Sequence, residues 1–336
     1  MQKRKTEKQE GLKMAQKGDL MTVRHDIRVL DATLRDGGLV NNFYFTDDFV
    51  KALYRTNVKA GVDYMEFGYK ASKEIFDVDK YGKWKFCDED AIREVVGEND
   101  TDLKIAVMAD VGRCDYKNDI VAKADSAIDM VRVATYVNTM PAAIDMIEDA
   151  KNKGYEVTCN IMAISNAQEG DVRTALKMLG ESPVECIYIV DSYGSLFPEQ
   201  IRRITELYLE FATIYDKKLG IHAHNNQQLA FANTIEAVAG GVSYLDATMS
   251  GMGRGAGNCS MELLLGFLKN PKYKQIPVLK FLEEYMLGLK KDGAVWGYDI
   301  PYMLTGQLDL HPSSAIEAVK AGRTDYKDFY MEMVDR

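Results

Sequence analysis

The sequence predicts an α/β fold, a TIM (β/α)8 barrel with a short helical C-terminal extension. Short apolar or β-branched runs alternate with longer segments of helical periodicity, and eight such runs follow one another. Alternating strands and helices form a parallel sheet, and eight units favour closure into a barrel over an open sheet. The stretch from Ile27 to Asn270 also has close to the ~250 residues typical of this barrel.

Eight segments have the composition of buried strands. Each is short, rich in apolar and β-branched residues, and followed by a polar or glycine-containing loop. They are residues 27–33, 64–68, 103–110, 130–135, 155–164, 186–192, 218–224 and 244–249.

Apolar periodicity predicts helices in the segments between these strands. Thr46 is suited to cap the first helix and Thr139 the second, with Pro141 in the first turn of the latter. Gly61 and Gly154 are suited to end these two helices. The expected helical ranges are 46–61, 139–154, 197–218 and 225–241.

The two ends of the chain differ from the barrel pattern. Residues 1–22 are charged and lack the apolar core of a signal peptide, so we expect a flexible N-terminal tail. Residues 23–270 are expected to form the catalytic barrel. Residues 271–336 combine glycine, proline and aromatic residues, and we expect a helical extension or lid there.

Composition excludes several classes of function. The formal net charge of the 336 residues is -9, which disfavours a nucleic-acid partner. No apolar run approaches the roughly 20 residues of a membrane span. The five cysteines are odd in number and form no CxxC pair, which indicates a reducing, cytoplasmic location rather than a disulfide scaffold.

Two of the four histidines, His222 and His224, lie two positions apart at the end of a predicted strand. Side chains at i and i+2 of a strand share a face, and histidine is the commonest metal ligand. Asp36, after the first strand, would complete a set of two histidines and one carboxylate at the C-terminal face of the barrel. Asn258, after the last strand, would add a neutral oxygen. Such a mixed set favours Mn²⁺, Mg²⁺, Co²⁺ or Fe²⁺ over structural Zn²⁺.

Other polar residues also fall at strand ends, where packing alone does not explain them, because unpaired buried charge is costly. Arg35, beside Asp36, would place a cation where an enolate oxygen develops charge. The competing interpretation of Arg35 is a salt bridge inside the barrel mouth. Asp191 is a second catalytic candidate. The candidates for substrate binding are Glu66, Arg132 and Asn160.

The glycine-rich stretch "GMGRGAGN", residues 251–258, follows the last predicted strand. A dinucleotide-binding fingerprint would follow the first strand instead, so this stretch is interpreted as a turn. Glycines also let the backbone approach a ligand closely, which makes Gly253 and Gly255 candidates for substrate binding.

Three stretches, "DATLRDGG", "HAHNN" and "GMGRGAGN", resemble the signatures of the DRE-TIM metallolyase superfamily, also called HMGL-like. That group includes 4-hydroxy-2-oxovalerate aldolase, hydroxymethylglutaryl-CoA lyase, and the isopropylmalate and homocitrate synthases. "MVRVAT" and "VDSYG" are similar to the aldolase branch.

The resemblance implies a divalent metal on Asp36, His222 and His224, with Asn258 a further ligand in some branches. Mn²⁺ or Mg²⁺ is expected first, with Co²⁺ or Zn²⁺ as alternatives. The resemblance also implies that the metal chelates a 2-oxo acid and that Arg35 stabilises the enolate. A 4-hydroxy-2-oxo acid would be cleaved to pyruvate, or a related 2-oxo acid, and an aldehyde, or formed from them.

The chain departs from the aldolase pattern at one catalytic position. The resemblance implies a histidine three residues after the metal-binding aspartate, and Leu39 stands there. Tyr298 resembles a C-terminal tyrosine of the aldolases and is a third catalytic candidate, with Tyr302 and His311 as alternatives. Each of the three has a competing interpretation as a packed lid residue. Tyr136 also stands where aldolase-like sequences often have histidine.

Three other functions stay open at this point. An acyl-CoA lyase or Claisen-type synthase could use the same barrel, although Cys259 lies after Asn258 rather than in the loop before it. A non-catalytic metal-binding barrel is favoured by Leu39. A non-haem iron oxygenase fits the ligand triad alone. As partners, the outer helices suit a homodimer, and the resemblance implies an acylating aldehyde dehydrogenase.

Overall fold

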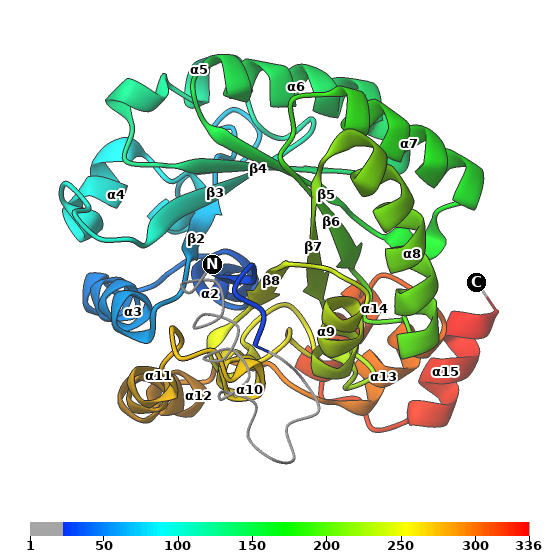
Figure 1. The fold of residues 1–336 in the computed structure, drawn as a ribbon. Helices are drawn as coiled ribbons and strands as arrows, with labels where there is room; N and C mark the ends of the chain where they lie inside the picture. The colour runs from blue at the N-terminus through cyan, green and yellow to red at the C-terminus, as the bar shows by residue number, and fades with distance from the viewer. Residues whose placement is uncertain (1–22, 336) are drawn as a thin grey trace, which may run out of the picture.

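The computed structural model describes residues 23–335, and the predicted tail at 1–22 lies outside them. Eight parallel strands form a closed barrel in chain order, as predicted (Figure 1). The strands are β1 Arg28–Asp31, β2 Tyr64–Tyr69, β3 Lys104–Asp110, β4 Met130–Thr135, β5 Glu156–Ile161, β6 Cys186–Asp191, β7 Lys218–Ala223 and β8 Tyr244–Ala247.

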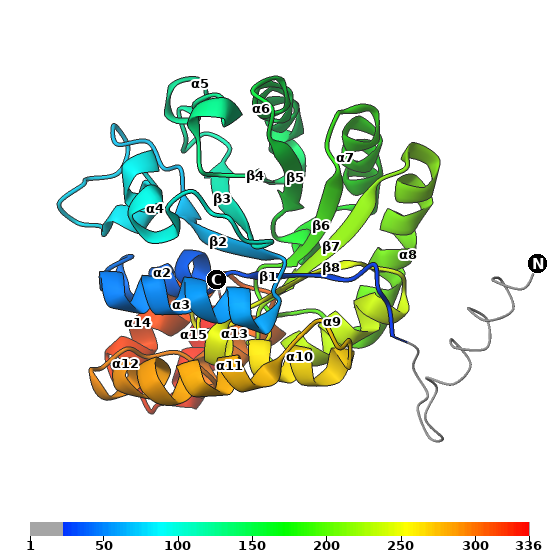
Figure 2. The same ribbon diagram turned by 60° about the vertical axis from the view of Figure 1, so that its left-hand side comes forward.

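Helices surround this barrel on its outer side (Figure 2). They are α2 Thr33–Asn41, α3 Asp47–Ala60, α4 Glu89–Val96, α5 Tyr116–Asp119, α6 Met140–Asn152, α7 Glu169–Glu181, α8 Pro198–Tyr215, α9 Ala230–Ala239 and α10 Met261–Leu268. No helix in the described part of the chain is long and apolar enough to cross a membrane.

Both predicted caps hold for α3, and α6 has the predicted Pro141 in its first turn and Gly154, at a φ of 96°, just after its C-terminal end, but not the predicted N-terminal side-chain cap. Thr46 accepts a hydrogen bond from the Phe49 amide at the start of α3, and Gly61 ends that helix at a φ of 74°. Thr139 stands at the N-cap position of α6, but its hydroxyl does not cap that helix. It accepts from the Tyr136 amide at 3.2 Å instead, which stabilises the preceding turn.

The segment after β1 is helical, which the sequence did not indicate. Residues 33–41 form α2, and Arg35 and Asp36 lie buried in its first turns. The Asp31 carboxylate accepts hydrogen bonds from the Thr33 amide and hydroxyl, so the last residue of β1 fixes the start of α2. Asp36 is thereby held by a helix rather than by a mobile loop.

The barrel interior changes from apolar to charged along the strands. Tyr64, Met130 and Tyr244 belong to small apolar clusters separate from the main core. Two residues further along the same three strands stand Glu66, Arg132 and Asp246, all buried. Because i and i+2 of a strand share a face, these three charges also point inward, one step nearer the C-terminal face.

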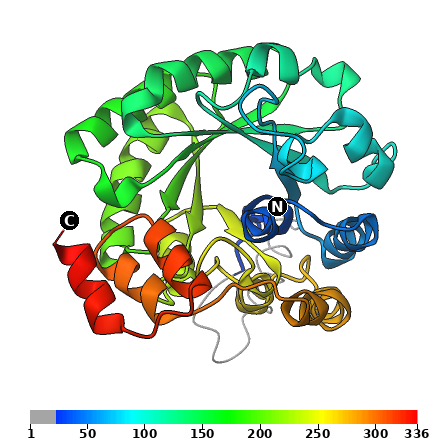
Figure 3. The ribbon, with the colours of Figure 1, turned by 180° about the vertical axis from the view of Figure 1, so that it is seen from behind.

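The C-terminal segment is helical, as predicted. It comprises α11 Gln275–Phe281, a π-helical turn Leu282–Met286, α12 Leu287–Lys291, α13 Ile300–Gln307, α14 Ser313–Lys320 and α15 Tyr326–Val334. Phe281 of α11 packs on Phe49 of α3 with ring centres 5.2 Å apart. Helices α13 to α15 form an apolar cluster around Tyr302 that includes Ala256 of the glycine loop (Figure 3).

Candidate active site

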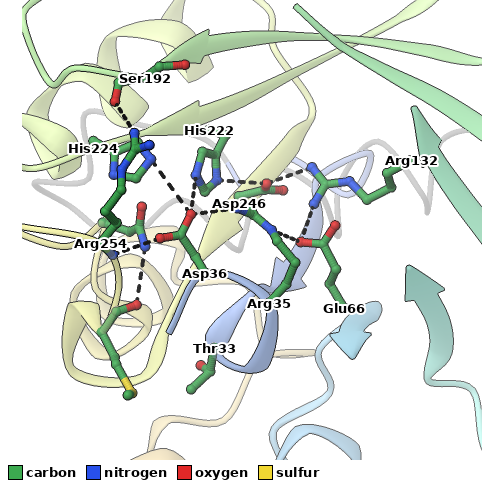
Figure 4. Close-up of polar contacts among 12 residues, drawn as sticks. Thr33, Arg35, Asp36, Glu66, Arg132, Ser192, His222, His224, Asp246 and Arg254 are labelled. Atoms are coloured by element: carbon green, nitrogen blue, oxygen red, sulfur yellow. Dashed lines mark hydrogen bonds and ion pairs between the residues drawn. The ribbon is translucent and has the colours of Figure 1, made fainter. Parts of the chain in front are cut away.

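Asp36, His222 and His224 meet at the C-terminal face of the barrel. All three are buried, and one ligand atom of each lies within 4.8 Å of the others. Asp36 Oδ2 is 3.3 Å from His222 Nε2 and 3.7 Å from His224 Nε2 (Figure 4). The histidines share a face because they are two residues apart at the end of β7.

Hydrogen bonds and charges prepare these three side chains to hold a cation. His222 Nδ1 lies 3.0 Å from Asp246 Oδ2, which orients the ring and leaves Nε2 directed at Asp36. Burial lowers the pKa of His224 well below its usual range, so that its ring is neutral. Burial alone would raise the pKa of Asp36, but Arg35 and the histidines outweigh burial and hold this pKa well below its usual range.

Asn258 offers a fourth donor, a neutral oxygen, beside these three side chains. Its Nδ2 donates to the Met252 carbonyl at 3.2 Å, while its Oδ1 is buried without a hydrogen-bond partner. His222 Nε2 likewise has no hydrogen bond. Buried polar atoms without partners are unusual in folded proteins. An anionic carboxylate and two imidazole nitrogens that converge, with a buried amide oxygen on the glycine loop beside them, fit a divalent cation.

The glycine loop holds the other oxygen of the Asp36 carboxylate. The Arg254 amide donates to Asp36 Oδ1 at 3.0 Å. A Cβ atom on Gly253 would lie 2.0 Å from Asn258 Nδ2 and 2.7 Å from Asp36 Oδ1, closer than atoms can approach. Gly253 is therefore required so that the loop can pass against the candidate ligands.

Four buried charged side chains lie behind the three candidate ligands. We call them the inner charge network: Arg35, Glu66, Arg132 and Asp246. Arg35 Nη1 lies 2.6 Å from Asp36 Oδ2, and Arg35 Nε lies 2.8 Å from Glu66 Oε2. Arg132 Nη1 lies 2.9 Å from the same Glu66 oxygen, and Arg132 Nη2 lies 2.6 Å from Asp246 Oδ2. Asp246 then contacts His222. Each buried charge thus faces an opposite one.

A small cavity of about 80 Å³ opens over these groups. Its wall combines the candidate ligands with aromatic and cationic side chains of several strand ends. The lining residues are Arg35, Asp36, Leu39, Tyr69, Met108, Ala134, Tyr136, Asn160, Met162, Val190, Ser192, Tyr193, His222, His224, Arg254 and His311. A larger hollow of about 520 Å³ lies beside α7 and α8, but none of the candidate ligands lines it.

Some of the predicted site residues line the cavity, and others are buried behind it. Arg35, Asn160 and the three candidate ligands line the cavity, as does Leu39 at the position of the expected histidine. Glu66 and Arg132 are fully buried behind it, paired within the inner charge network. Their geometry gives them a positioning role, and direct contact with a substrate stays a prediction.

Three further candidates lie outside the cavity wall. Asp191 is buried and accepts from the Ser195 amide at 3.0 Å, and burial raises its pKa to about 7. It shapes the loop after β6. Tyr298 is 52% exposed and does not line the cavity. Gly255 has a φ of 63°, and a Cβ atom built on it would lie 3.4 Å from the ring of Tyr302. Catalytic or binding roles for these residues stay predictions.

Sequence analysis missed four residues that define the site. Asp246 orients His222, and its signal is a single carboxylate inside the apolar strand β8. Arg254 is the charged residue of the glycine loop, in a position otherwise suited to small residues. Tyr69 ends β2 and Tyr193 follows β6; both line the cavity, and no local pattern distinguishes them from the other tyrosines.

Comparison with known proteins agrees with this geometry. Residues 26–280 match the family described as HMGL-like. The chain is 34% identical over 255 residues to an oxaloacetate decarboxylase of Mycobacterium tuberculosis (strain ATCC 25618 / H37Rv), covering 74% of this chain and 72% of that relative. It is 27% identical over 320 residues to a 4-hydroxy-2-oxovalerate aldolase of Bacillus cereus (strain ATCC 10987 / NRS 248), covering 92% and 91%.

A solved structure is similar along most of the chain. It is the N-terminal domain of a proposed aldolase from Bacteroides vulgatus, with a TM-score of 0.74 and 27% sequence identity. The match covers 87% of this chain and 96% of that one. This chain belongs to the HMGL-like family of the DRE-TIM metallolyase superfamily, which explains the three signature stretches, the closed barrel and the convergence of Asp36, His222 and His224.

Proposed function

We propose that this protein is a divalent-metal-dependent aldolase. It cleaves a 4-hydroxy-2-oxo acid to pyruvate, or a related 2-oxo acid, and an aldehyde, and it catalyses the reverse condensation. The observation that carries the proposal is one small cavity that brings Arg35 together with Asp36, His222 and His224. The 4-hydroxy-2-oxovalerate aldolase relative, matched along nearly the whole chain, supports the same reaction.

Asp36, His222 and His224 would hold the metal, with Asn258 Oδ1 as a further donor. A bound divalent cation supplies Lewis-acid polarisation of the keto group and a fixed place for the carboxylate of a 2-oxo acid. Mixed oxygen and nitrogen donors suit Mn²⁺ or Mg²⁺ first, with Co²⁺ or Zn²⁺ as alternatives.

Arg35 would stabilise the enolate. Its Nη1 and Nε are taken by Asp36 and Glu66, while Nη2 is buried and has no hydrogen-bond partner in the described structure. When the C3–C4 bond of the substrate breaks, its electron pair moves into the C2–C3 bond and the C2 oxygen gains negative charge. The Arg35 Nη2–H is a preorganised donor for that oxygen in a site shielded from water.

The proton on the C4 hydroxyl must leave as the aldehyde forms, and a proton must return to C3 of the enolate. Leu39 can do neither. We assign the proton transfers to Tyr69, which lines the cavity and whose hydroxyl has no hydrogen bond to a described residue. Burial raises the pKa of Tyr69 above its usual value, so the phenol stays protonated and passes the C4 proton on to C3 as a relay.

Decarboxylation of oxaloacetate is a second candidate, favoured by the relative that is 34% identical. Loss of CO₂ from C4 of oxaloacetate leaves the same pyruvate enolate, so Arg35 would have the same role. The two reactions differ in the second product, which is CO₂ in one and an aldehyde in the other. A homodimer, or an acylating aldehyde dehydrogenase that accepts the aldehyde, remains a proposal about partners.

The test is exchange of the pyruvate methyl protons in D₂O, followed by NMR with Mg²⁺ added. We expect metal-dependent exchange in the wild type and its loss in Asp36→Asn and His222→Ala. His25→Ala changes an exposed histidine away from the site and serves as the matched control. A metal-loaded wild type that exchanges no methyl protons, with pyruvate or with 2-oxobutanoate, would overturn the proposal and favour acyl-CoA chemistry or metal binding alone.

A further inference from the structure

The guanidinium of Arg254 is the second cation of the cavity, and it lacks a charged partner. Its Nη2 donates to the Ser192 carbonyl at 2.8 Å, and its Nη1 contacts His311 Nε2 at 3.2 Å. Its Nε is buried without a partner. Within the described residues, no carboxylate lies at ion-pair distance from this side chain. A cation facing a cavity without a counter-charge is arranged for an anion.

His311 has more donors around it than it can satisfy. Its Nε2 faces Arg254 Nη1, and its Nδ1 faces the Ser313 amide at 3.2 Å. Arginine and a backbone amide can only donate, whereas a neutral imidazole has one accepting nitrogen. Burial lowers the pKa of His311, so the neutral ring prevails at pH 7. The ring can therefore accept from only one of the two donors, and an added acceptor at this place would satisfy the other.

The two guanidinium groups lie on different sides of the candidate ligands (Figure 4). Arg35 reaches toward the inner charge network, and Arg254 reaches past His224 toward Ser192. A 2-oxo acid head bound at Asp36, His222 and His224 would use Arg35 for its C2 oxygen. The rest of the substrate would then extend toward Arg254, His311 and Tyr193, which line the same cavity.

We infer that Arg254 and His311 form a subsite for an anionic group on the aldehyde half of the substrate. The aldehyde would be a short one with a terminal carboxylate, bound by the planar donor face of Arg254. This inference rests on the proposed aldolase function and names the substrate class of the same site.

Arg254 could instead serve only to attach the C-terminal segment to the barrel, since His311 lies between α13 and α14. The two roles predict different measurements. A structural link would change stability and the turnover of every aldehyde alike. An anion subsite would change KM for a carboxylated aldehyde while sparing a neutral aldehyde of the same length.

The test compares condensation of pyruvate with succinic semialdehyde and with pentanal, a neutral chain of similar length. We expect the wild type to prefer succinic semialdehyde and Arg254→Gln to lose about 10-fold to 100-fold of that preference, through KM, as a charge-assisted hydrogen bond is lost. Arg254→Lys should recover part of it. Arg203→Gln, which removes an exposed cation from α8, is the matched control. Glycolaldehyde phosphate tests phosphate as the anion.

Binding to the metal-loaded protein separates this inference from the proposed function. Calorimetry with 2-oxoglutarate and 2-oxohexanoate should show tighter binding of 2-oxoglutarate, and Arg254→Gln should abolish the difference. Equal binding of the two acids by the wild type, or equal losses for both aldehydes in Arg254→Gln, would overturn the anion subsite. Pyruvate exchange in that same wild type would leave the aldolase proposal standing. Tighter binding without exchange would instead refute the aldolase and keep the subsite.

Discussion

The two arginines beside Asp36 stand in opposite electrostatic surroundings. Arg35 is 4% exposed and contacts two carboxylates, and behind it Glu66, Arg132 and Asp246 continue the alternation of charge. Arg254 is half-buried and contacts a carbonyl oxygen and an imidazole. One arginine therefore has its charge compensated by the protein, and the other does not.

The difference separates the parts of the site that position groups from the parts that are available to a ligand. Removing one partner from a buried set of charges leaves an uncompensated ion, which costs much more than the loss of an exposed pair. The Arg35 side must therefore stay intact for the barrel to remain stable. The Arg254 side gains its counter-charge only when an anion binds. The predictions below test this contrast.

The largest effect is expected from the candidate metal ligands. Asp36→Asn and His222→Ala should weaken Mn²⁺ binding by at least about 100-fold, because the first removes the charge of a direct donor and the second removes a direct donor, rather than an orienting group worth 10–100-fold. Calorimetric titration with Mn²⁺ measures this. Asp246→Asn loosens the orientation of His222 and also removes an ion-pair partner of Arg132, and its effect on Mn²⁺ affinity should fall within that 10–100-fold range. Equal affinity in Asp36→Asn and wild type would show that the metal lies elsewhere.

Breaking the inner charge network should destabilise the fold strongly. Glu66→Ala leaves Arg35 and Arg132 without their shared partner and should lower the free energy of unfolding by about 3–5 kcal/mol. Arg254→Gln should lower it by less than about 1 kcal/mol, because that cation has no ion pair to lose. Urea unfolding measures both. A loss in Arg254→Gln as large as that in Glu66→Ala would erase the contrast between the two sides.

Asp31 and Asp36 are both buried, but Asp31 has only neutral partners. Burial raises the pKa of Asp31 to about 6, although Thr33 and Asn57 donate hydrogen bonds to it. The folded protein therefore holds this proton more tightly than the unfolded chain. That stability is present below about pH 4 and is lost as the pH rises through 6, by about 3 kcal/mol in all.

Unfolding of wild type and Asp31→Asn at pH 4.5 and pH 7 checks this linkage. The amide does not titrate, so the variant should gain stability relative to wild type as the pH rises. A difference between the two proteins that does not change with pH would mean that Asp31 ionises normally. Tyr54→Phe removes a hydroxyl that donates to Asn99 rather than to Asp31, and it is a control for buried polar substitutions in general.

Tyr69→Phe should change catalysis alone. Removal of the hydroxyl should slow pyruvate methyl exchange by about 100-fold, the lower end of acid–base contributions, without changing Mn²⁺ affinity. Tyr136→Phe removes another cavity-lining hydroxyl that is half exposed and is the matched control. A normal exchange rate in Tyr69→Phe with a slow rate in Tyr136→Phe would transfer the proton relay to Tyr136.

The sequence by itself determined the barrel and the metal-binding pattern. Short apolar, β-branched runs and helix caps are local features, so the strand β4 was predicted with its observed bounds and α3 with both of its caps. The spacing of His222 and His224 also settles locally that they share a face. Asp36 could be added because the C-terminal ends of barrel strands always gather on one side.

Only the tertiary structure decided which charged side chains pair with each other and which stay available to a ligand. Glu66 and Arg132 were predicted from sequence as substrate-binding residues. Closure of the barrel pairs them with each other, 66 positions apart, and pairs Arg132 with Asp246, 114 positions further along the chain. Likewise, the contacts of Arg254 with Ser192 and His311 depend on how the C-terminal helices pack on the glycine loop. Sequence shows that a charge is present, but the charge that opposes it is determined by register and packing.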